Sequence, residues 1–380
     1  MEAFRINVPE PVLTDLHQRL AHTRWPDELN GADWTYGTNL GYLKQLAAYW
    51  QNDYDWRGQE EKLNKFPHFK AEVDGLNIHY IKVEGKGPNP LPLLLTHGWP
   101  DSFFRMLKII PLLTDPAAHG GRAEDAFTVI VPDMPGYGFS DKPKEAGYDP
   151  TRIAGVFDKL MQQLGYDVYY AHGGDWGSSV TEQLGLHHTS TVKAIHLTDV
   201  PSSHAKVADK LPDLSATEKA WIVKNKAWQE AEAGYQKIQG TKPETLAFGL
   251  NDSPVGTLGW IIEKFHAWSD NDGNIEHTFT KDDLLTNVMI YWVTQSIGSS
   301  VRLYYEAMHN PALQAPTHVD LPTGFAIFPK DITPAPKEFA ERFFNVQHWQ
   351  EMPRGGHFAA LEEPGLLVAD IREFFRQFRP

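Results

Sequence analysis

A single carboxylate stands at the centre of the glycine-rich turn 173–177, which reads Gly-Gly-Asp-Trp-Gly. The apolar run 168–171 precedes this turn, and a helical pattern begins at about residue 177. A strand–turn–helix corner of this kind is typical of a nucleophile elbow, whose glycines permit a tight turn that lifts the central side chain above a sheet. We therefore predict that Asp175 is a nucleophile kept ionised by the helix N-terminus, and a helix N-cap is the alternative.

Two further residues stand where a catalytic acid and a histidine should follow such a nucleophile. Asp331 comes just after the apolar run 325–328, and His357 lies in the glycine-rich segment 354–358 before the last helical pattern. The chain order nucleophile, acid, histidine is the one that this strand-and-helix arrangement uses. We predict that Asp331 orients His357 and that His357 activates a water molecule. The alternatives are a turn or N-cap role for Asp331 and a helix-capping role for His357.

A third loop, His-Gly-Trp-Pro at 97–100, ends the apolar run 91–96. In the arrangement that the elbow predicts, the loop after this strand gives one backbone N–H to an oxyanion hole, and the residue after the nucleophile gives the other. We predict that Trp99 and Trp176 donate these two N–H groups. We also expect Trp99, Pro100 and Trp176 to contact the substrate, and a simple strand-ending turn is the alternative.

The elements around these loops alternate between continuous apolar strands and helical patterns. An alternating segment with Asp74-Gly75 at its centre predicts a hairpin before the first of these strands. The apolar runs lie at 91–96, 127–131, 168–171, 194–197, 323–328 and 346–349. Such an order predicts an α/β protein with a mostly parallel central sheet and helices on both faces. Together with the elbow, it predicts the α/β-hydrolase fold.

The rhythm of strands and helices divides the chain into three parts. Residues 1–66 show amphipathic helical spacing and predict a helical meander that packs on a larger body. Residues 67–200 and 313–380 carry the strands and predict the hydrolase core. Residues 201–312 are helical and rich in tryptophan, which predicts a helical cap inserted after strand 6.

The composition restricts the classes of partner. The 380 residues include 35 Lys and Arg against 49 Asp and Glu, for a formal charge of −14, so we expect no nucleic-acid partner. The absence of Cys excludes disulfides and thiolate metal sites. The N-terminus has no secretory signal, and every apolar run is far shorter than the roughly 20 residues of a membrane helix. We expect a cytoplasmic protein without membrane anchor, metal or cofactor, and the sequence leaves a homodimer open.

The motifs together resemble those of epoxide hydrolases of the microsomal and juvenile hormone type. The resemblance covers nearly the whole chain, and its segments appear in the same order along it. They are residues 42–56, 97–100, 135–140, 173–178, 250–256, 283–288 and 354–360. The sequence departs from the microsomal enzymes because it lacks their membrane-anchoring N-terminal helix and has Asp331 where they carry Glu.

The resemblance implies that the cap carries two tyrosines that hold an epoxide oxygen. Tyr235 matches the first, and Tyr304 matches the second, with the adjacent Tyr305 as the alternative for that position. The implied reaction adds water to a small apolar epoxide and gives a vicinal diol, through an ester between substrate and Asp175. A haloalkane dehalogenase, which also uses an elbow aspartate, and a non-catalytic binding protein of the same fold are the alternatives.

Overall fold

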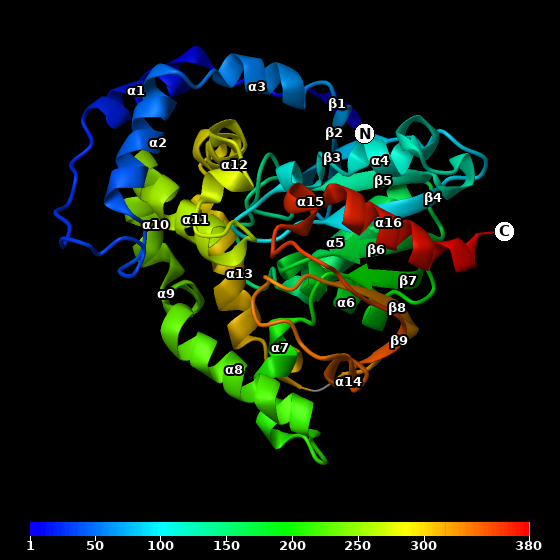
Figure 1. The fold of residues 1–380 in the computed structure, drawn as a ribbon. Coiled ribbons are helices and arrows are strands. Elements are labelled where there is room, and N and C mark those ends of the chain that lie inside the picture. Colours follow the sequence, from blue (N-terminus) through cyan, green and yellow to red (C-terminus); the bar gives the residue numbers. More distant parts are fainter. Residues whose placement is uncertain (316, 380) are drawn as a thin grey trace.

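The computed structural model describes residues 1–315 and 317–379. Nine strands form one sheet in the order β1-β2-β3-β5-β4-β6-β7-β8-β9 (Figure 1). The strands β4 to β9 pair parallel, whereas β1, β2 and β3 add an antiparallel edge. In chain order they are β1 (Glu2–Phe4), β2 (His68–Val73), β3 (Leu76–Val83), β4 (Leu91–Thr96), β5 (Phe127–Pro132), β6 (Tyr169–Gly173), β7 (Val192–Leu197), β8 (Val319–Ile327) and β9 (Phe344–Glu351). The prediction of a mostly parallel sheet is confirmed.

Helices cover both faces of this sheet, as the contacts of two neighbouring tyrosines of β6 show. Successive side chains of a strand point to opposite faces. The Tyr169 hydroxyl donates a 2.9 Å hydrogen bond to Asp158 in α5 (Pro150–Gln163). The Tyr170 ring instead packs on Phe375 at the end of α16 (Pro364–Phe375), with ring centroids 5.3 Å apart. The strands between these layers are continuous apolar runs because both of their faces are buried.

A helical insertion separates β7 from β8 in the chain. It follows the sixth of the predicted strands, which is the seventh strand of the sheet because the sequence patterns did not reveal the short strand β1. Its helices are α7 (Ser202–Ala205), α8 (Ala216–Glu232), α9 (Gly234–Thr241), α10 (Pro243–Asp252), α11 (Pro254–Trp268), α12 (Lys281–Thr294) and α13 (Ile297–His309). They gather on one side of the sheet (Figure 1).

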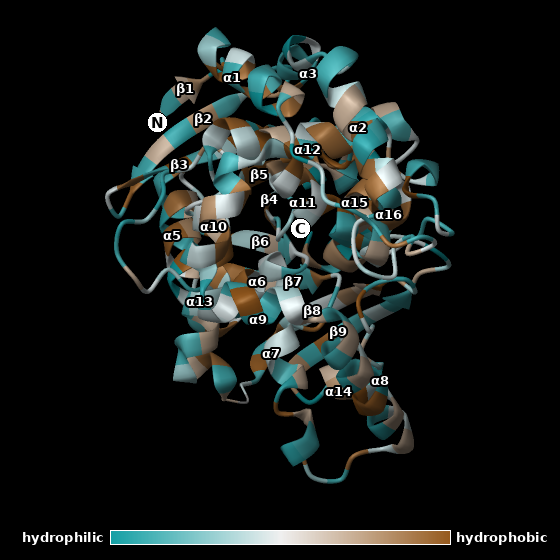
Figure 2. Ribbon diagram, turned by 90° about the vertical axis from the view of Figure 1, so that its left-hand side faces the viewer, coloured by the Kyte–Doolittle hydropathy of each residue, from teal (hydrophilic) through white to brown (hydrophobic). Residues whose placement is uncertain are grey.

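The N-terminal helices α1 (Glu10–Ala21), α2 (Leu40–Asn52) and α3 (Trp56–Leu63) curve around this insertion (Figure 1). Trp50 donates from its indole nitrogen to the sulfur of Met289 at 3.2 Å, and Tyr54 shares a 3.0 Å hydrogen bond with Thr286. Hydrophobic residues mark α12 where it lies inside this arc, while α3 at the rim is mainly hydrophilic (Figure 2). The meander therefore packs against the cap, as an amphipathic segment should.

Four α-helices complete the described core. They are α4 (Ile110–Thr114), α6 (Trp176–His187), α14 (Lys337–Ala340) and α15 (Ala359–Glu362). Within residues 1–315 and 317–379, no helix combines the length and the apolar character that a bilayer crossing requires.

Candidate active site

The corner between β6 and α6 holds Asp175 in a strained conformation, with φ 59° and ψ −127°. A backbone in such a region costs a non-glycine residue about 1–3 kcal/mol, and it is usually kept only where its surroundings enforce it. The glycines beside it make the turn possible. A Cβ on Gly173 would collide with the carbonyl of Gly177, and a Cβ on Gly177 would collide with the carbonyl of Thr96. The side chain of Asp175 is thereby presented above the carboxyl ends of the strands.

The structure brings Asp331 and His357 to this side chain. Asp331 Oδ1 lies 2.7 Å from His357 Nδ1, and His357 Nε2 lies 3.4 Å from Asp175 Oδ2. The two loops meet because β8 and β9 are parallel neighbours, and a bridge between Lys330 and Gly356 continues their pairing beyond the strands. The three predicted residues therefore form one continuous chain of polar contacts, with the histidine in the middle.

The charges of this chain control the protonation of His357. Burial by itself would lower the pKa of the imidazole, but the Asp331 and Asp175 carboxylates more than offset it and raise the pKa of His357 to about 10. The Nδ1 contact with Asp331 fixes the orientation of the ring. The two carboxylates therefore favour the protonated, cationic form of the buried His357.

Two charged residues that the sequence analysis missed hold the loops in place. Arg105 is buried and donates to the backbone carbonyl of His357 at 2.6 Å and to Asp101 at 2.6 Å. Asp101 in turn accepts the Gly98 N–H at 2.8 Å.

Glu362 holds the histidine loop from the other side. It accepts the N–H groups of the residues that flank His357, from Gly356 at 2.9 Å and from Phe358 at 2.8 Å. Burial raises the pKa of Glu362 to about 7.

The predicted oxyanion-hole donors are placed differently from each other. The Trp99 N–H already donates a 2.7 Å hydrogen bond to Asp175 Oδ1. Trp176 is the first residue of α6, where a helix leaves its N–H groups without intrahelical partners. Neither Trp99 nor Pro100 is among the residues that line the cavity at Asp175, and their contact with the substrate stays a prediction. The carbonyl of Pro100 accepts a 2.8 Å hydrogen bond from Asn287, which joins this loop to α12.

The insertion contributes the two tyrosines from different helices, Tyr235 from α9 and Tyr304 from α13. Their ring centroids are 5.9 Å apart. Trp99 stacks on Tyr235 at 5.6 Å and meets Tyr304 edge-on at 5.7 Å, and Trp176 meets Tyr304 edge-on at 4.8 Å. Aromatic packing of this kind fixes ring orientation without competing for the hydroxyl groups.

Tyr305 points elsewhere. It is 39% exposed and stacks on His309 with ring centroids 4.0 Å apart, whereas Tyr304 is only 3% exposed and lines the cavity. Neighbouring residues on a helix project about 100° apart, so only one of the two can face Asp175. The structure therefore brings Tyr304, and not Tyr305, to the site.

Both cavity tyrosines stay protonated. Burial and the Asp175 carboxylate raise the pKa of Tyr235, while burial, Tyr235 and Asp175 raise the pKa of Tyr304. Each phenol is thus available as a hydrogen-bond donor. The buried ammonium group of Lys264 lies 4.5 Å from the centroid of the Tyr235 ring, a second feature that sequence spacing did not reveal.

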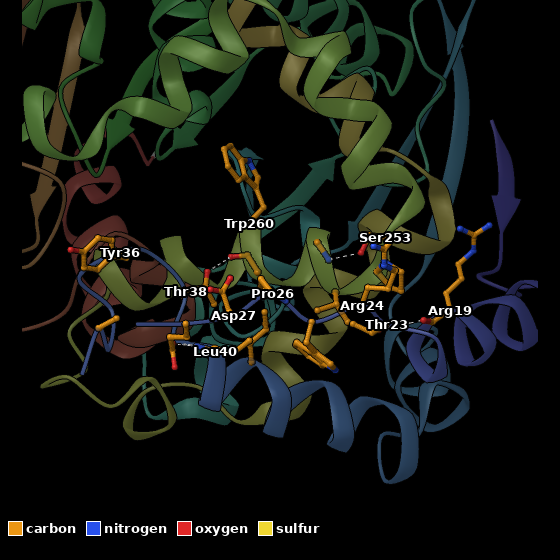
Figure 3. Close-up of a pocket in the computed structure, with 18 of the residues that line it drawn as sticks. Arg19, Thr23, Arg24, Pro26, Asp27, Tyr36, Thr38, Leu40, Ser253 and Trp260 are labelled. Atoms are coloured by element: carbon orange, nitrogen blue, oxygen red, sulfur yellow. Dashed lines mark hydrogen bonds between the residues drawn. The ribbon is translucent and has the colours of Figure 1, made fainter. Parts of the chain in front are cut away.

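Asp175, His357, Tyr235 and Tyr304 line a single cavity of about 100 Å³. Much of the remaining wall is apolar and comes from Trp176, Val200, Trp221, Trp228, Met308 and Ile327. A larger, more open pocket of about 840 Å³ lies between the loop after α1 and the start of α11, with Arg24, Asp27 and Trp260 in its wall (Figure 3). None of the triad residues lines that pocket, so the chemistry belongs to the smaller cavity.

The strand order, the elbow with its aspartate and the acid–histidine pair at the strand ends define an α/β hydrolase with a carboxylate at its elbow. Residues 92–229 match the family model described as alpha/beta hydrolase fold, and residues 1–106 match that of the epoxide hydrolase N terminus.

Full-length relatives give the family. The chain is 41% identical over 399 residues to epoxide hydrolase 1 of Oryctolagus cuniculus, covering 98% of this chain and 88% of that protein. It is 38% identical over 405 residues to juvenile hormone epoxide hydrolase 2 of Ctenocephalides felis, covering 100% and 86%. The crystal structure of juvenile hormone epoxide hydrolase from Bombyx mori superposes with a TM-score of 0.90 at 31% identity, covering 100% and 94%. The chain belongs to the epoxide hydrolase family, which confirms the resemblance.

Proposed function

We propose that this chain adds water to an epoxide and forms a vicinal diol through a covalent ester on Asp175. The observation that carries the proposal is the composition of one cavity. The same cavity of about 100 Å³ is lined by a carboxylate on a strained elbow, an acid–histidine pair and two protonated tyrosines. A carboxylate can attack an sp³ carbon, and the phenols can assist the oxygen that leaves it.

The first step is the opening of the ring. Trp99 N–H binds Asp175 Oδ1, which leaves Oδ2 as the oxygen that attacks the epoxide carbon. The carbon–oxygen bond of the ring breaks as the new ester bond forms. Tyr235 and Tyr304 donate hydrogen bonds to the epoxide oxygen, and one of them transfers its proton to the forming hydroxyl group. General acid assistance of this kind commonly contributes about 10²–10⁴-fold to the rate.

The second step is hydrolysis of the ester. Esterification removes the negative charge of Asp175, one of the two anions that raise the pKa of His357, so the imidazole loses its proton more readily and becomes a base. This proton passes through solvent to the tyrosinate that ring opening left, which restores the phenol. Neutral His357 takes a proton from water, and the oxygen of that water attacks the Asp175 carbonyl carbon. The N–H groups of Trp99 and Trp176 stabilise the oxyanion. The diol leaves with the oxygen of Asp175 that attacked it.

The cavity favours a small apolar epoxide. Its volume is about 100 Å³, and its wall includes three tryptophans. Apolar walls bind the hydrocarbon part of a ligand, while a few polar groups fix its orientation. The wall also carries other polar side chains, and among its polar groups the two tyrosines of the cap and Asp175 of the sheet are the ones that would hold the epoxide ring between them.

The His357→Gln variant tests the proposal because it blocks only the second step. Incubation with styrene oxide should raise the intact mass by the mass of one epoxide. The double variant Asp175→Ala, His357→Gln is the matched control and should show no increase. An unshifted His357→Gln mass after prolonged incubation would contradict the covalent route, and release of halide from chloroalkanes without diol formation would favour the dehalogenase alternative.

A further inference from the structure

A third carboxylate, Asp199, lies against the back of the elbow. It stands two residues after β7 and lines the same cavity as Asp175. Its Oδ1 accepts the backbone N–H of Asp175 at 2.8 Å and the hydroxyl of Ser178 at 2.7 Å. Asp199 therefore joins the strand side of the corner to the first turn of α6.

The N–H of Asp175 needs such a partner. The pairing of β6 with β7 ends at Gly173, whose carbonyl accepts the Thr198 N–H at 3.2 Å. The next residues turn away from the ladder, and Asp175 adopts its positive φ. An unpaired buried N–H is unfavourable by an amount comparable to the strain of the elbow itself. The Asp199 side chain therefore stabilises this conformation.

We propose that Asp199 is a positioning residue for the nucleophile. Its carboxylate holds the elbow in the conformation in which Asp175 Oδ1 meets the Trp99 N–H and Oδ2 faces the substrate. The inference rests on the proposed function, because it concerns the attack by Asp175. Beyond that function, the rate of this attack depends on Asp199, a residue that never touches the epoxide carbon.

The charge of Asp199 adds a pH dependence to this role. Burial and the nearby Asp331 carboxylate raise the pKa of Asp199 to about 6, while the Ser178 hydroxyl, His357 and the Asp175 N–H oppose the rise. The Arg105 guanidinium faces the same corner from beside Gly174. Hydrogen bonds to an ionised carboxylate are stronger than those to a neutral one. The elbow should therefore be held most firmly above about pH 6.

The test measures ester formation alone, in the His357→Gln background, by the time course of the intact mass. Asp199→Ala should slow ester formation by about 10²-fold at saturating styrene oxide, since a small misplacement of a reacting group has an effect of this size. The half-saturating concentration should change little. Asp199→Asn keeps an acceptor oxygen without the charge, and it should slow the step by about tenfold. It should also abolish the inflection that Asp199 causes, which lies above pH 6 in this background because His357→Gln removes a cation that opposes the rise of the Asp199 pKa.

Asp158→Ala is the matched control. This buried aspartate accepts hydrogen bonds from Tyr169 and Thr191 near the start of β6 and does not contact the elbow. It should lower the melting temperature and leave the rate of ester formation unchanged.

Equal rates for Asp199→Ala and the parent would overturn the positioning role, as would a pH profile of Asp199→Asn identical to that of the parent. If Asp199→Ala fails to fold, the pH profile of Asp199→Asn decides alone. Absence of ester in the His357→Gln parent would instead refute the proposed function, and this inference with it.

Discussion

The two halves of the candidate site are held by different physical means. Asp175, Asp331 and His357 come from strand ends. A 2.7 Å hydrogen bond joins Asp331 to His357, and a 3.4 Å ion-pair contact joins His357 to Asp175. Tyr235 and Tyr304 come from the cap, and aromatic faces and edges at 4.8–5.9 Å hold them. Charged groups need directional partners when they are buried, whereas an aromatic ring can be oriented by packing against other rings.

Because of this difference, we expect the sheet residues and the cap tyrosines to affect ring opening and ester hydrolysis differently. The sheet residues contact the nucleophile, so their loss should affect ester formation, ester hydrolysis or both. The cap tyrosines face only the oxygen of the epoxide, so their loss should slow ring opening and leave hydrolysis of a preformed ester nearly unchanged. Separate measurement of the two steps shows whether the halves are as independent as their packing implies.

The largest effect is expected for Asp175→Ala. Removal of a covalent nucleophile commonly costs about 10⁴-fold or more in turnover, because the remaining groups cannot replace its bond to carbon. Diol formation from styrene oxide should fall to near the uncatalysed rate. A variant that keeps more than a tenth of the parent activity would mean that water attacks the epoxide directly.

Tyr235→Phe and Tyr304→Phe should each slow ester formation by about 10²-fold, because each removes one hydrogen bond to the leaving oxygen. Tyr305→Phe is the matched control, and it should behave like the parent because Tyr305 is 39% exposed and stacks on His309. Rapid-mixing mass measurements in the His357→Gln background give these rates. A larger loss for Tyr305→Phe than for Tyr304→Phe would reverse the assignment of the second tyrosine.

Glu362→Ala should affect hydrolysis more than ring opening. Glu362 accepts the N–H groups of Gly356 and Phe358, so its loss frees the loop that presents His357. We expect ester hydrolysis to slow by about tenfold through misplacement of the base, with ring opening changed by less than about threefold. Equal slowing of both steps would show that the loop also supports the nucleophile.

The smallest effect concerns stability, and it contrasts two kinds of histidine. Burial and the neighbouring His79 lower the pKa of His68 to about 4, whereas the carboxylates around His357 raise the pKa of that residue to about 10. The unfolded chain binds the proton of His68 at about pH 6.5. The contribution of His68 to the free energy of unfolding is therefore complete above pH 6.5 and declines as the pH falls toward 4.

Comparison with His68→Gln isolates this contribution, because Glu362 and Asp199 titrate in the same range with the opposite sign. Urea unfolding at pH 7.5, 5.5 and 4.5 measures it. The stability difference between parent and variant should shrink as the pH falls. A difference that stays constant would mean that His68 is not held neutral in the folded protein.

The same contrast explains what the sequence could and could not predict. Each triad member follows an apolar strand in a fixed chain order, so Asp175, Asp331 and His357 could be placed from pattern alone. The tyrosines come from separate helices of the insertion, and no spacing relates Tyr235 to Tyr304. Only family resemblance suggested them, and the choice of Tyr304 over Tyr305 needed the rotation of α13.

Other residues could not be predicted because their roles arise from tertiary contacts. Arg105 donates to the carbonyl of His357, which is far from it in the sequence, and Glu362 accepts the N–H of Phe358 in the histidine loop. Asp199 has its proposed role because the Asp175 N–H points toward it. The hydrogen bond that the Pro100 carbonyl accepts from Asn287 could not be predicted either, because it joins the core to α12 of the insertion. The limits of the domains and the cytoplasmic location stay predictions.

A single turnover in ¹⁸O-labelled water, with enzyme in excess over styrene oxide, tests the covalent role of Asp175 most directly. We expect the diol to carry no label and the peptide containing Asp175 to gain it, because the nucleophile gives its own oxygen to the product and recovers one from water. Label in the diol together with an unlabelled Asp175 would contradict covalent catalysis by Asp175.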